Sequence, residues 1–353
     1  MKRAHRLLLP GMVLGILGAA PLGAQNDDPW SFVVLGHIRG WNNALHPRLG
    51  DLLAEVRTLR PDLVVLAGDQ IWGDMGQGQV PRRRSAVEKE WADLDSALAT
   101  VGVPRIQVPG NHEINDLVTR DVYRERFGDL PRSLTMRNVR FLLLNSVWIP
   151  EDGDTTLARN IRGVDLDSAQ VRWLREELAR PVAPPHTVVV LHHLLWWEGD
   201  DGPWWREVHP LLREAGVRAV VSGDHGPLKF SHMERDGVSY YQVSIGGDPS
   251  LDMLRNRESS RTLAAQFDAF LRVRVDGPTF EVDVETTGEV SSGHFTPSHY
   301  REVHEFRPPP RPRLERLWEL INSPARLTAL ALLILGSIGT GVVIGRWKAG
   351  SRE

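Results

Sequence analysis

Short runs of consecutive apolar residues recur between residue 31 and about residue 285, and stretches with helical periodicity separate them. The predicted strands are Phe32–Leu35, Leu63–Ala67, Ile106–Val108, Phe141–Leu144, Val188–Leu191 and Val217–Val221. The predicted helices are Leu49–Arg60, Val87–Thr100, Ala169–Ala179 and Trp204–Ala215. A period-two pattern predicts a hairpin from Phe270–Val275 and Thr279–Val284. Apolar strands alternating with amphipathic helices predict an α/β fold in which both faces of the sheet are covered.

The first 24 residues have the pattern of a secretory signal peptide. Three basic residues within the first six precede an apolar run, Leu7–Ala20, and small residues follow as far as Ala24. We therefore expect a signal peptide over residues 1–24 with cleavage after Ala24. The alternative at this end is an uncleaved membrane anchor.

The other end of the chain predicts a membrane anchor. Leu327–Gly345 carries no charge over 19 residues, enough for a helix to cross a bilayer. Trp318 and Trp347 bracket it, and a short basic tail, residues 346–353, is expected in the cytoplasm. Residues 300–323 predict a proline-rich stalk and a short amphipathic helix. We expect a globular domain over residues 29–290, tethered on the extracytoplasmic side of the cell membrane.

Charge and cysteine content exclude several classes of protein. The net charge is −3, from 42 basic and 45 acidic residues, which is not the basic excess of a general nucleic-acid-binding surface. The chain has no cysteine, so a disulfide framework, a thiolate metal site and a cysteine nucleophile are all excluded.

Polar residues follow five of the predicted strands. In chain order they are His37 and Arg39, then Asp69, then Asn111 and His112, then His192, and finally Asp224 and His225. Because the carboxyl ends of strands in such sheets line one crevice, we expect these side chains to meet. Aspartate, asparagine and histidine are ligands that suit a hard or borderline divalent metal ion.

The order and context of these motifs resemble the calcineurin-like metallophosphoesterase superfamily. Its pattern is D-x-H, then G-D, then G-N-H-D/E, then a histidine after a strand, then G-H-x-H. The chain matches the middle of this pattern at Gly68-Asp69, Gly110-Asn111-His112-Glu113 and Leu191-His192. The resemblance covers residues 31–285 and implies two facing mixed β-sheets flanked by α-helices.

The resemblance implies hydrolysis of a phosphate mono- or diester by metal-activated water. In the family the G-D aspartate, here Asp69, bridges two metal ions. The G-N-H histidine, here His112, assists the leaving oxygen. Glu113 or Asp116 is a candidate to orient the His112 imidazole. The implied cofactor is Mn, Fe, Zn or Mg, and the implied substrate is a phosphate ester.

The chain departs from the family pattern in the first and last motifs. His37 and Arg39 stand where the family has aspartate and histidine, and an arginine cannot ligate a metal ion. Asp224 replaces the first histidine of the last motif, and His225 is one residue short of the second.

One metal position therefore keeps a ligand set, consisting of Asp69, Asn111, His192 and Asp224. The other is left with only His37 and His225, so we expect one ion and disfavour a second. Arg39 has two interpretations. It replaces the missing positive charge and binds the phosphoryl group with two hydrogen bonds, or it pairs with Asp69 or Asp224 in an inactive site. The second interpretation predicts a binding or sensor domain that has lost turnover.

Three further groups of residues each have two interpretations. Arg82-Arg83-Arg84 either attracts an anionic substrate or belongs to a solvated loop. A second group consists of Trp196, Trp197, Trp204 and Trp205. These tryptophans either form an aromatic rim at the site or pack against a helix. His232 is either a ligand or a packed histidine.

We expect the protein to sediment with membranes, and protease added from the outer side to remove its globular domain. The uncharged stretch near the C-terminus and the leader-like N-terminus are the reasons. Cell fractionation with immunoblotting measures this, and a variant that ends at residue 323 should leave the membrane fraction. A soluble cytoplasmic protein with an intact N-terminus would contradict the prediction.

Overall fold

The computed structural model describes residues 28–75, 82–148, 163–180, 184–197, 201–224, 229–245, 268–287 and 294–295. The chain divides into two units, Met1–Glu305 and Phe306–Glu353, and every described residue belongs to the first. The predicted signal peptide, stalk and transmembrane segment lie outside the described residues, as does His225. Among the helices that the structure describes, none combines the length and the apolar character needed to cross a membrane.

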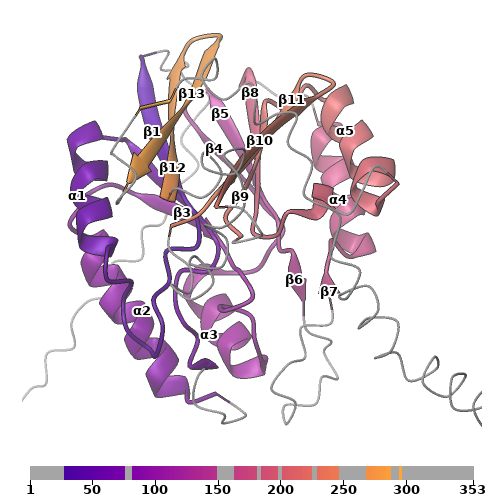
Figure 1. Ribbon diagram of the computed structural model, residues 1–353. Helices are drawn as coiled ribbons and strands as arrows, with labels where there is room; N and C mark the ends of the chain where they lie inside the picture. Colours follow the sequence, from indigo (N-terminus) through magenta and orange to yellow (C-terminus); the bar gives the residue numbers. More distant parts are fainter. Residues whose placement is uncertain are drawn as a thin grey trace, which may run out of the picture. The chain divides into compact units, whose positions relative to one another are not determined.

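Two six-stranded mixed β-sheets face each other (Figure 1). The first contains, in spatial order, β14 (His294–Phe295), β13 (Thr279–Thr287), β12 (Asp268–Asp276), β1 (Trp30–Leu35), β2 (Leu63–Ala67) and β3 (Arg105–Val108). The second contains β10 (Phe230–Arg235), β11 (Val238–Val243), β9 (Ala219–Ser222), β8 (His186–Leu191), β5 (Val139–Leu143) and β4 (Arg132–Met136). A separate two-stranded sheet pairs β6 (Val147–Trp148) with β7 (Gly163–Val164).

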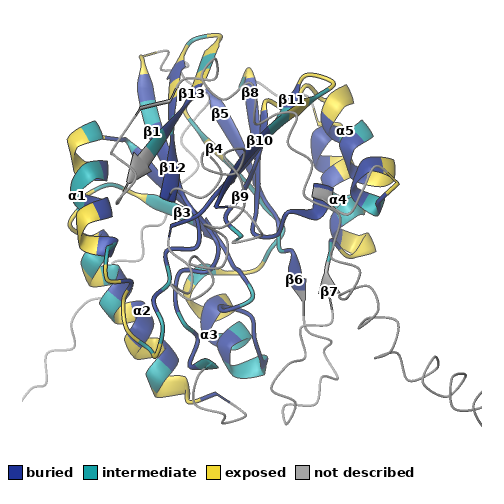
Figure 2. Ribbon diagram, in the orientation of Figure 1, coloured by how far each residue is buried: buried dark blue, intermediate teal, exposed yellow. Residues whose placement is uncertain are grey.

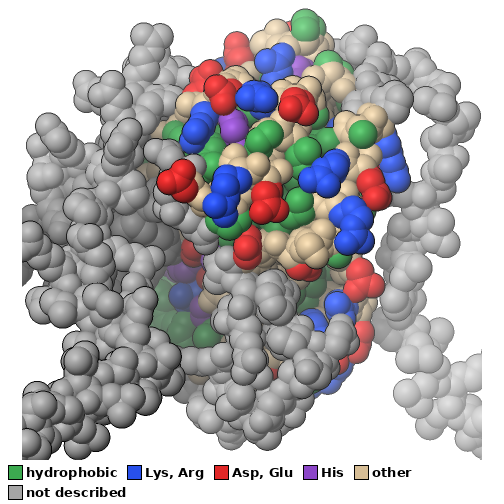
Figure 3. All heavy atoms as spheres, turned by 90° about the vertical axis from the view of Figure 1, so that its right-hand side faces the viewer, with side chains coloured by type: hydrophobic (Ala, Val, Ile, Leu, Met, Phe, Trp, Pro, Cys, Tyr) green, Lys and Arg blue, Asp and Glu red, His purple; other side chains and the backbone are tan. Residues whose placement is uncertain are grey.

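Helices cover the outer face of each sheet, which confirms the predicted architecture. Against the first sheet pack α1 (Leu49–Leu59), α2 (Arg84–Leu98) and α3 (Leu117–Phe127). Against the second pack α4 (Ser168–Leu178), the π-helix η3 (Trp204–Val208) and α5 (His209–Glu214), with the 3-10 turn η2 (Leu195–Trp197) beside them. Figure 2 shows buried strands in the middle and helices exposed only on their outer sides. On the face that carries α4 and α5, acidic and basic side chains are interspersed (Figure 3).

The central strands are apolar throughout because both of their faces are buried. In β1, Phe32 and Val34 belong to the core between the sheets, whereas Val33 and Leu35 belong to the core under the helices. Phe32 meets Phe141 of the second sheet edge to face, with 5.2 Å between ring centroids. A strand buried on both faces reads as a continuous apolar run, which is why the sequence predicted these strands.

Elements with polar sequences were not predicted. The helix α3 has mostly polar residues, but a capping box starts it: Asp116 accepts the Thr119 N–H at 2.9 Å, and Thr119 Oγ1 accepts the Asp116 N–H. The strand β10 contains Ser, His, Glu and Arg, and among the described residues no strand pairs with its outer side. The predicted helix Trp204–Ala215 is instead η3 followed by α5.

The two sheets touch through their backbones at one end. A Cβ atom on Gly36, which follows β1, would lie 2.3 Å from Gly223 Cα and 2.3 Å from the Val243 carbonyl oxygen. Both contacts involve backbone atoms of the second sheet, so only a glycine allows this approach.

Replacing Gly36 by alanine should therefore lower the free energy of unfolding by about 1–3 kcal/mol, as expected for overpacking. Gly50→Ala is the matched control, because a Cβ at Gly50 of α1 would meet nothing within 4 Å. Alanine there should leave stability unchanged or raise it slightly. Urea denaturation of both variants measures the difference, and equal effects would show that the approach at Gly36 is not tight.

Candidate active site

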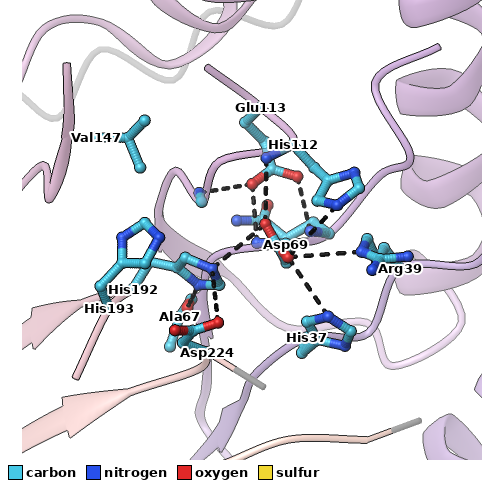
Figure 4. Close-up of polar contacts among 12 residues, drawn as sticks. His37, Arg39, Ala67, Asp69, His112, Glu113, Val147, His192, His193 and Asp224 are labelled. Carbon is cyan, nitrogen blue, oxygen red and sulfur yellow. Dashed lines mark hydrogen bonds and ion pairs between the residues drawn. The ribbon is translucent and has the colours of Figure 1, made fainter. Parts of the chain in front are cut away.

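The polar residues that follow β1, β2, β3, β8 and β9 meet around Asp69 at one end of the sheets (Figure 4). The two carboxylate oxygens of Asp69 face different partners. Oδ1 lies 3.4 Å from His192 Nε2 and accepts the His112 backbone N–H at 3.2 Å. Oδ2 lies 3.5 Å from both Arg39 Nε and His37 Nε2, and 3.9 Å from His112 Nε2. The strand ends therefore bring His37, Arg39, His112 and His192 to within 4 Å of Asp69, and Asp224 lies next to His192.

Asp69 is buried and ionised. Burial raises the pKa of its carboxyl, but the surrounding histidines and Arg39 outweigh this effect and hold the pKa well below its usual range. Its backbone has φ +53°, in the left-handed region. The preceding Gly68, at φ +85°, lies so close to His192 that a Cβ would be 2.4 Å from Nδ1 of that ring. A tight turn thus presents both carboxylate oxygens to the site.

One side of Asp69 has the chemistry of a metal position. His192 Nδ1 lies 3.0 Å from the Ala67 carbonyl oxygen, to which it donates, so its Nε2 is the available ligand atom. This Nε2 is buried without a hydrogen bond and faces Asp69 Oδ1 at 3.4 Å and Asp224 Oδ1 at 3.7 Å. Burial lowers the pKa of His192, whereas the two carboxylates raise it, and the net pKa is raised. Two carboxylates around one imidazole nitrogen require a positive charge, either a proton or a metal ion.

Glycine keeps this position open. A Cβ on Gly110 would lie 2.3 Å from Asp69 Oδ1 and 2.9 Å from His192 Nε2. In the described part of the chain, no three His, Asp or Glu side chains already stand together as a metal centre. Closing a ligand set therefore requires the Asp224 side chain, which is 26% exposed, or the amide of the half-buried Asn111.

The other side of Asp69 is occupied by a cation of the chain itself. The Arg39 guanidinium lies over the Trp72 ring, 4.9 Å from its centroid, with Nε toward Asp69. Arg39 Nη1 donates to the Gly40 carbonyl at 3.1 Å. His37 is buried on the same side of Asp69.

The expectation that Glu113 or Asp116 orients His112 is wrong. His112 Nδ1 lies 2.8 Å from the Trp72 carbonyl oxygen, and burial, opposed by Asp69 and aided by Arg39, lowers its pKa to about 4. Asp116 instead caps α3 and accepts the Arg82 backbone N–H at 2.7 Å. A backbone carbonyl is the orienting group, and no sequence pattern reveals it.

Glu113 and Glu90 bind consecutive backbone amides of the loop after β2. Glu113 accepts the N–H groups of Asp69, Gln70 and Ile71, and also that of Gly110, at 2.7–2.9 Å. Glu90 of α2 accepts those of Trp72, Gly73 and Asp74 at 2.7–3.0 Å. Burial and the Asp69 charge raise the pKa of Glu113 to about 7, and burial also raises the pKa of Glu90, while the amides act in the opposite direction. Sequence reasoning missed Glu90, whose only signal is an acid on the apolar face of a helix.

The other groups that the sequence singled out have partners outside the Asp69 cluster wherever their contacts are described. Arg83 binds Asp74 at 2.8 Å and Arg84 pairs with Glu88 and Glu125, so acidic partners balance these two charges. The packing interpretation of the tryptophans is confirmed for those that are described, since Trp196, Trp204 and Trp205 are buried around Tyr240. The side chain of Trp197 lies outside the described residues. His232 stacks on Tyr241, with 4.2 Å between ring centroids.

Comparisons with known proteins agree with this geometry. The family model for calcineurin-like phosphoesterases matches residues 40–226, more than half of the chain, beginning directly after Arg39. The chain therefore belongs to the calcineurin-like phosphoesterase family, as its motifs predicted. No curated protein sequence matches it.

A solved structure supports the fold. A dimetal phosphatase from Danio rerio is similar with a TM-score of 0.52 and 14% identity, over 76% of this chain and 98% of that chain. GAP50, the anchor in the inner membrane complex of Plasmodium, is similar with a TM-score of 0.49 and 12% identity, over 76% of this chain and 88% of that chain. At 14% identity, the likeness to the dimetal phosphatase concerns the fold alone.

Proposed function

We propose that this chain is a phosphoesterase that uses one divalent metal ion together with Arg39. Membership of the family supports a hydrolase of the phosphoesterase kind and dependence on a divalent ion. The observation that carries the finer proposal is the division of Asp69: Oδ1 faces His192, and Oδ2 faces Arg39. In the family this carboxylate bridges two ions, so Arg39 supplies the positive charge on the side where the second ion would lie.

The ion would be held on the Oδ1 side. Its ligands would be Asp69, Asn111, His192 and Asp224, and His37 and His225 remain the candidates for a weak second position. When bound, the ion lowers the pKa of the attacking water and neutralises charge on the phosphoryl group. Two carboxylates balance one divalent ion, so Arg39 adds the net positive charge that an anionic substrate requires.

Arg39 and His112 act on the substrate directly. The contacts with Asp69 and Gly40 use Arg39 Nε and Nη1, and among the described residues Nη2 makes no hydrogen bond or ion pair. Nη2 is therefore the donor that we assign to a phosphoryl oxygen. Because the Trp72 carbonyl accepts from Nδ1–H of His112, Nε2 faces the site as the unprotonated nitrogen. It would take up a proton from water and pass that proton to the leaving oxygen.

The proposal includes the location of the enzyme. The signal peptide pattern over residues 1–24 and the uncharged stretch 327–345 support an exported domain tethered in the cell membrane by its C-terminal helix. The phosphate-ester substrate would then be met on the extracytoplasmic side.

A second candidate function is a binding or sensor domain without turnover. The 3.5 Å contact between Arg39 and Asp69 favours it, because such an ion pair also neutralises a site that has lost one ion. The two functions differ in whether Arg39 contributes to a reaction rate.

Asp69→Ala should abolish metal binding, because a site built from several ligands fails when its shared carboxylate is removed. Wild type should retain about one equivalent of Mn or Zn after dialysis, measured by inductively coupled plasma mass spectrometry. Asp283→Ala is the matched control, since Asp283 is equally buried but lies on β13. An unchanged metal content in Asp69→Ala would show that Asp69 is not a metal ligand.

Arg39→Ala should lower the rate of aryl phosphate hydrolysis by about 10²–10³, the typical effect of removing an electrostatic donor. Arg137→Ala is the matched control, because Arg137 also pairs with an aspartate and lies over a tryptophan, Trp30. Its rate should equal that of wild type. The double replacement His37→Asp with Arg39→His rebuilds the first motif of the family. If wild type is inactive and the double variant gains both metal and activity, the sensor function is correct.

A further inference from the structure

Glu90 belongs to α2 and does not contact Asp69, yet its carboxylate fixes one loop of the site. Oε2 accepts the N–H groups of Trp72 at 2.7 Å and Gly73 at 3.0 Å, and Oε1 accepts that of Asp74 at 3.0 Å. The side chain is only 4% exposed. A buried carboxylate that binds three successive amides fixes the orientation of their peptide planes.

The bound loop has a backbone conformation that needs such support. Gly73 has φ +67° and Asp74 has φ +54°, both in the left-handed region. A Cβ on Gly73 would lie 2.1 Å from the carbonyl oxygen of His112. The loop therefore packs directly against the backbone of the residue that faces the leaving oxygen.

Trp72 connects this loop to both groups that act on the substrate. Its carbonyl oxygen accepts from His112 Nδ1 at 2.8 Å, which sets the tautomer and orientation of the imidazole. Its ring lies 4.9 Å from the Arg39 guanidinium and 5.2 Å from the His112 ring. A shift of this one residue would displace His112 and Arg39 together.

We propose that Glu90 is a positioning residue which, through the backbone of Trp72, aligns His112 and Arg39 with the same phosphoryl group. Its effect on turnover rests on the proposed phosphoesterase function. The alignment of the His112 ring, in contrast, is a property of the folded chain and can be measured without substrate.

Glu90→Gln puts an NH₂ group where a carboxylate oxygen accepts amide N–H groups, so at least one amide loses its acceptor. We expect kcat to fall on the order of 10- to 100-fold, as for a misplaced catalytic group. The loss should be larger for phenyl phosphate than for p-nitrophenyl phosphate, because the poorer leaving group depends more on His112. Glu177→Gln is the matched control: Glu177 is buried on α4, where it pairs with Arg180, and its rate and leaving-group dependence should be those of wild type.

Two measurements separate positioning from a loss of stability. In the background Arg39→Ala/His112→Ala, which lacks both groups through which Glu90 acts, the further change Glu90→Gln should slow the enzyme by no more than about twofold, because residues that act through one another are not additive. Imidazole ¹⁵N NMR on the full-length chain, with His112 assigned by its absence in His112→Ala, should show the Nδ1–H tautomer in wild type and Glu177→Gln. Glu90→Gln should show a mixture of tautomers.

Additive rate losses with an unchanged His112 tautomer would overturn the inference. If wild type hydrolyses no phosphate ester but Glu90→Gln still changes the tautomer, the proposed function fails while the alignment by Glu90 stands. Should Glu90→Gln not fold, Glu90→Asp keeps the charge and shortens the reach by one methylene. It is then expected to change the tautomer and the leaving-group dependence in the same direction, and no change in either would overturn the inference.

Discussion

Six consecutive backbone amides, from Asp69 to Asp74, are bound by two buried glutamates, and the geometry of the site depends on them. Glu113 reaches the first half of the loop from the end of β3, and Glu90 reaches the second half from α2. Without these acceptors the amides would be buried and unsatisfied, which costs about 1–3 kcal/mol for each group. Asp69 and Asp74, both at positive φ, keep their conformations inside this network.

The division of Asp69 between two kinds of partner gives the site its chemical character. One carboxylate oxygen faces an imidazole nitrogen held ready for a cation, and the other faces a guanidinium that is already present. In the proposed function, the site combines a position for an exchangeable metal ion with a charge that is fixed to the chain. A fixed guanidinium cannot be lost by dilution or chelation, but it also cannot activate water, so the two sides of Asp69 are not equivalent in what they contribute.

The fold and most of the site could be predicted from the sequence because both depend on local patterns. Strands buried on both faces are continuous apolar runs, as in Leu63–Ala67, and glycine with Asp, Asn or His directly after a strand marks a site at the sheet edge. The interactions that could not be predicted use groups without a sequence signature. The group that orients His112 is the backbone carbonyl of Trp72, and every residue of any chain has a backbone carbonyl. Glu90 differs from an exposed helical glutamate only in its burial. The role of the tryptophans after His192 could not be decided from the sequence, because the rim of a binding site and a hydrophobic core contain the same aromatic residue types.

The close approach of Gly36 to Gly223 places the ends of two different sheets side by side, and this affects what an ion at the site would do mechanically. Asp69 follows β2 of the first sheet, whereas His192 and Asp224 follow β8 and β9 of the second. An ion bound by all three would cross-link the two sheets. Its binding energy would then also resist separation of the two layers, so that occupancy and mechanical cohesion of the domain would rise and fall together.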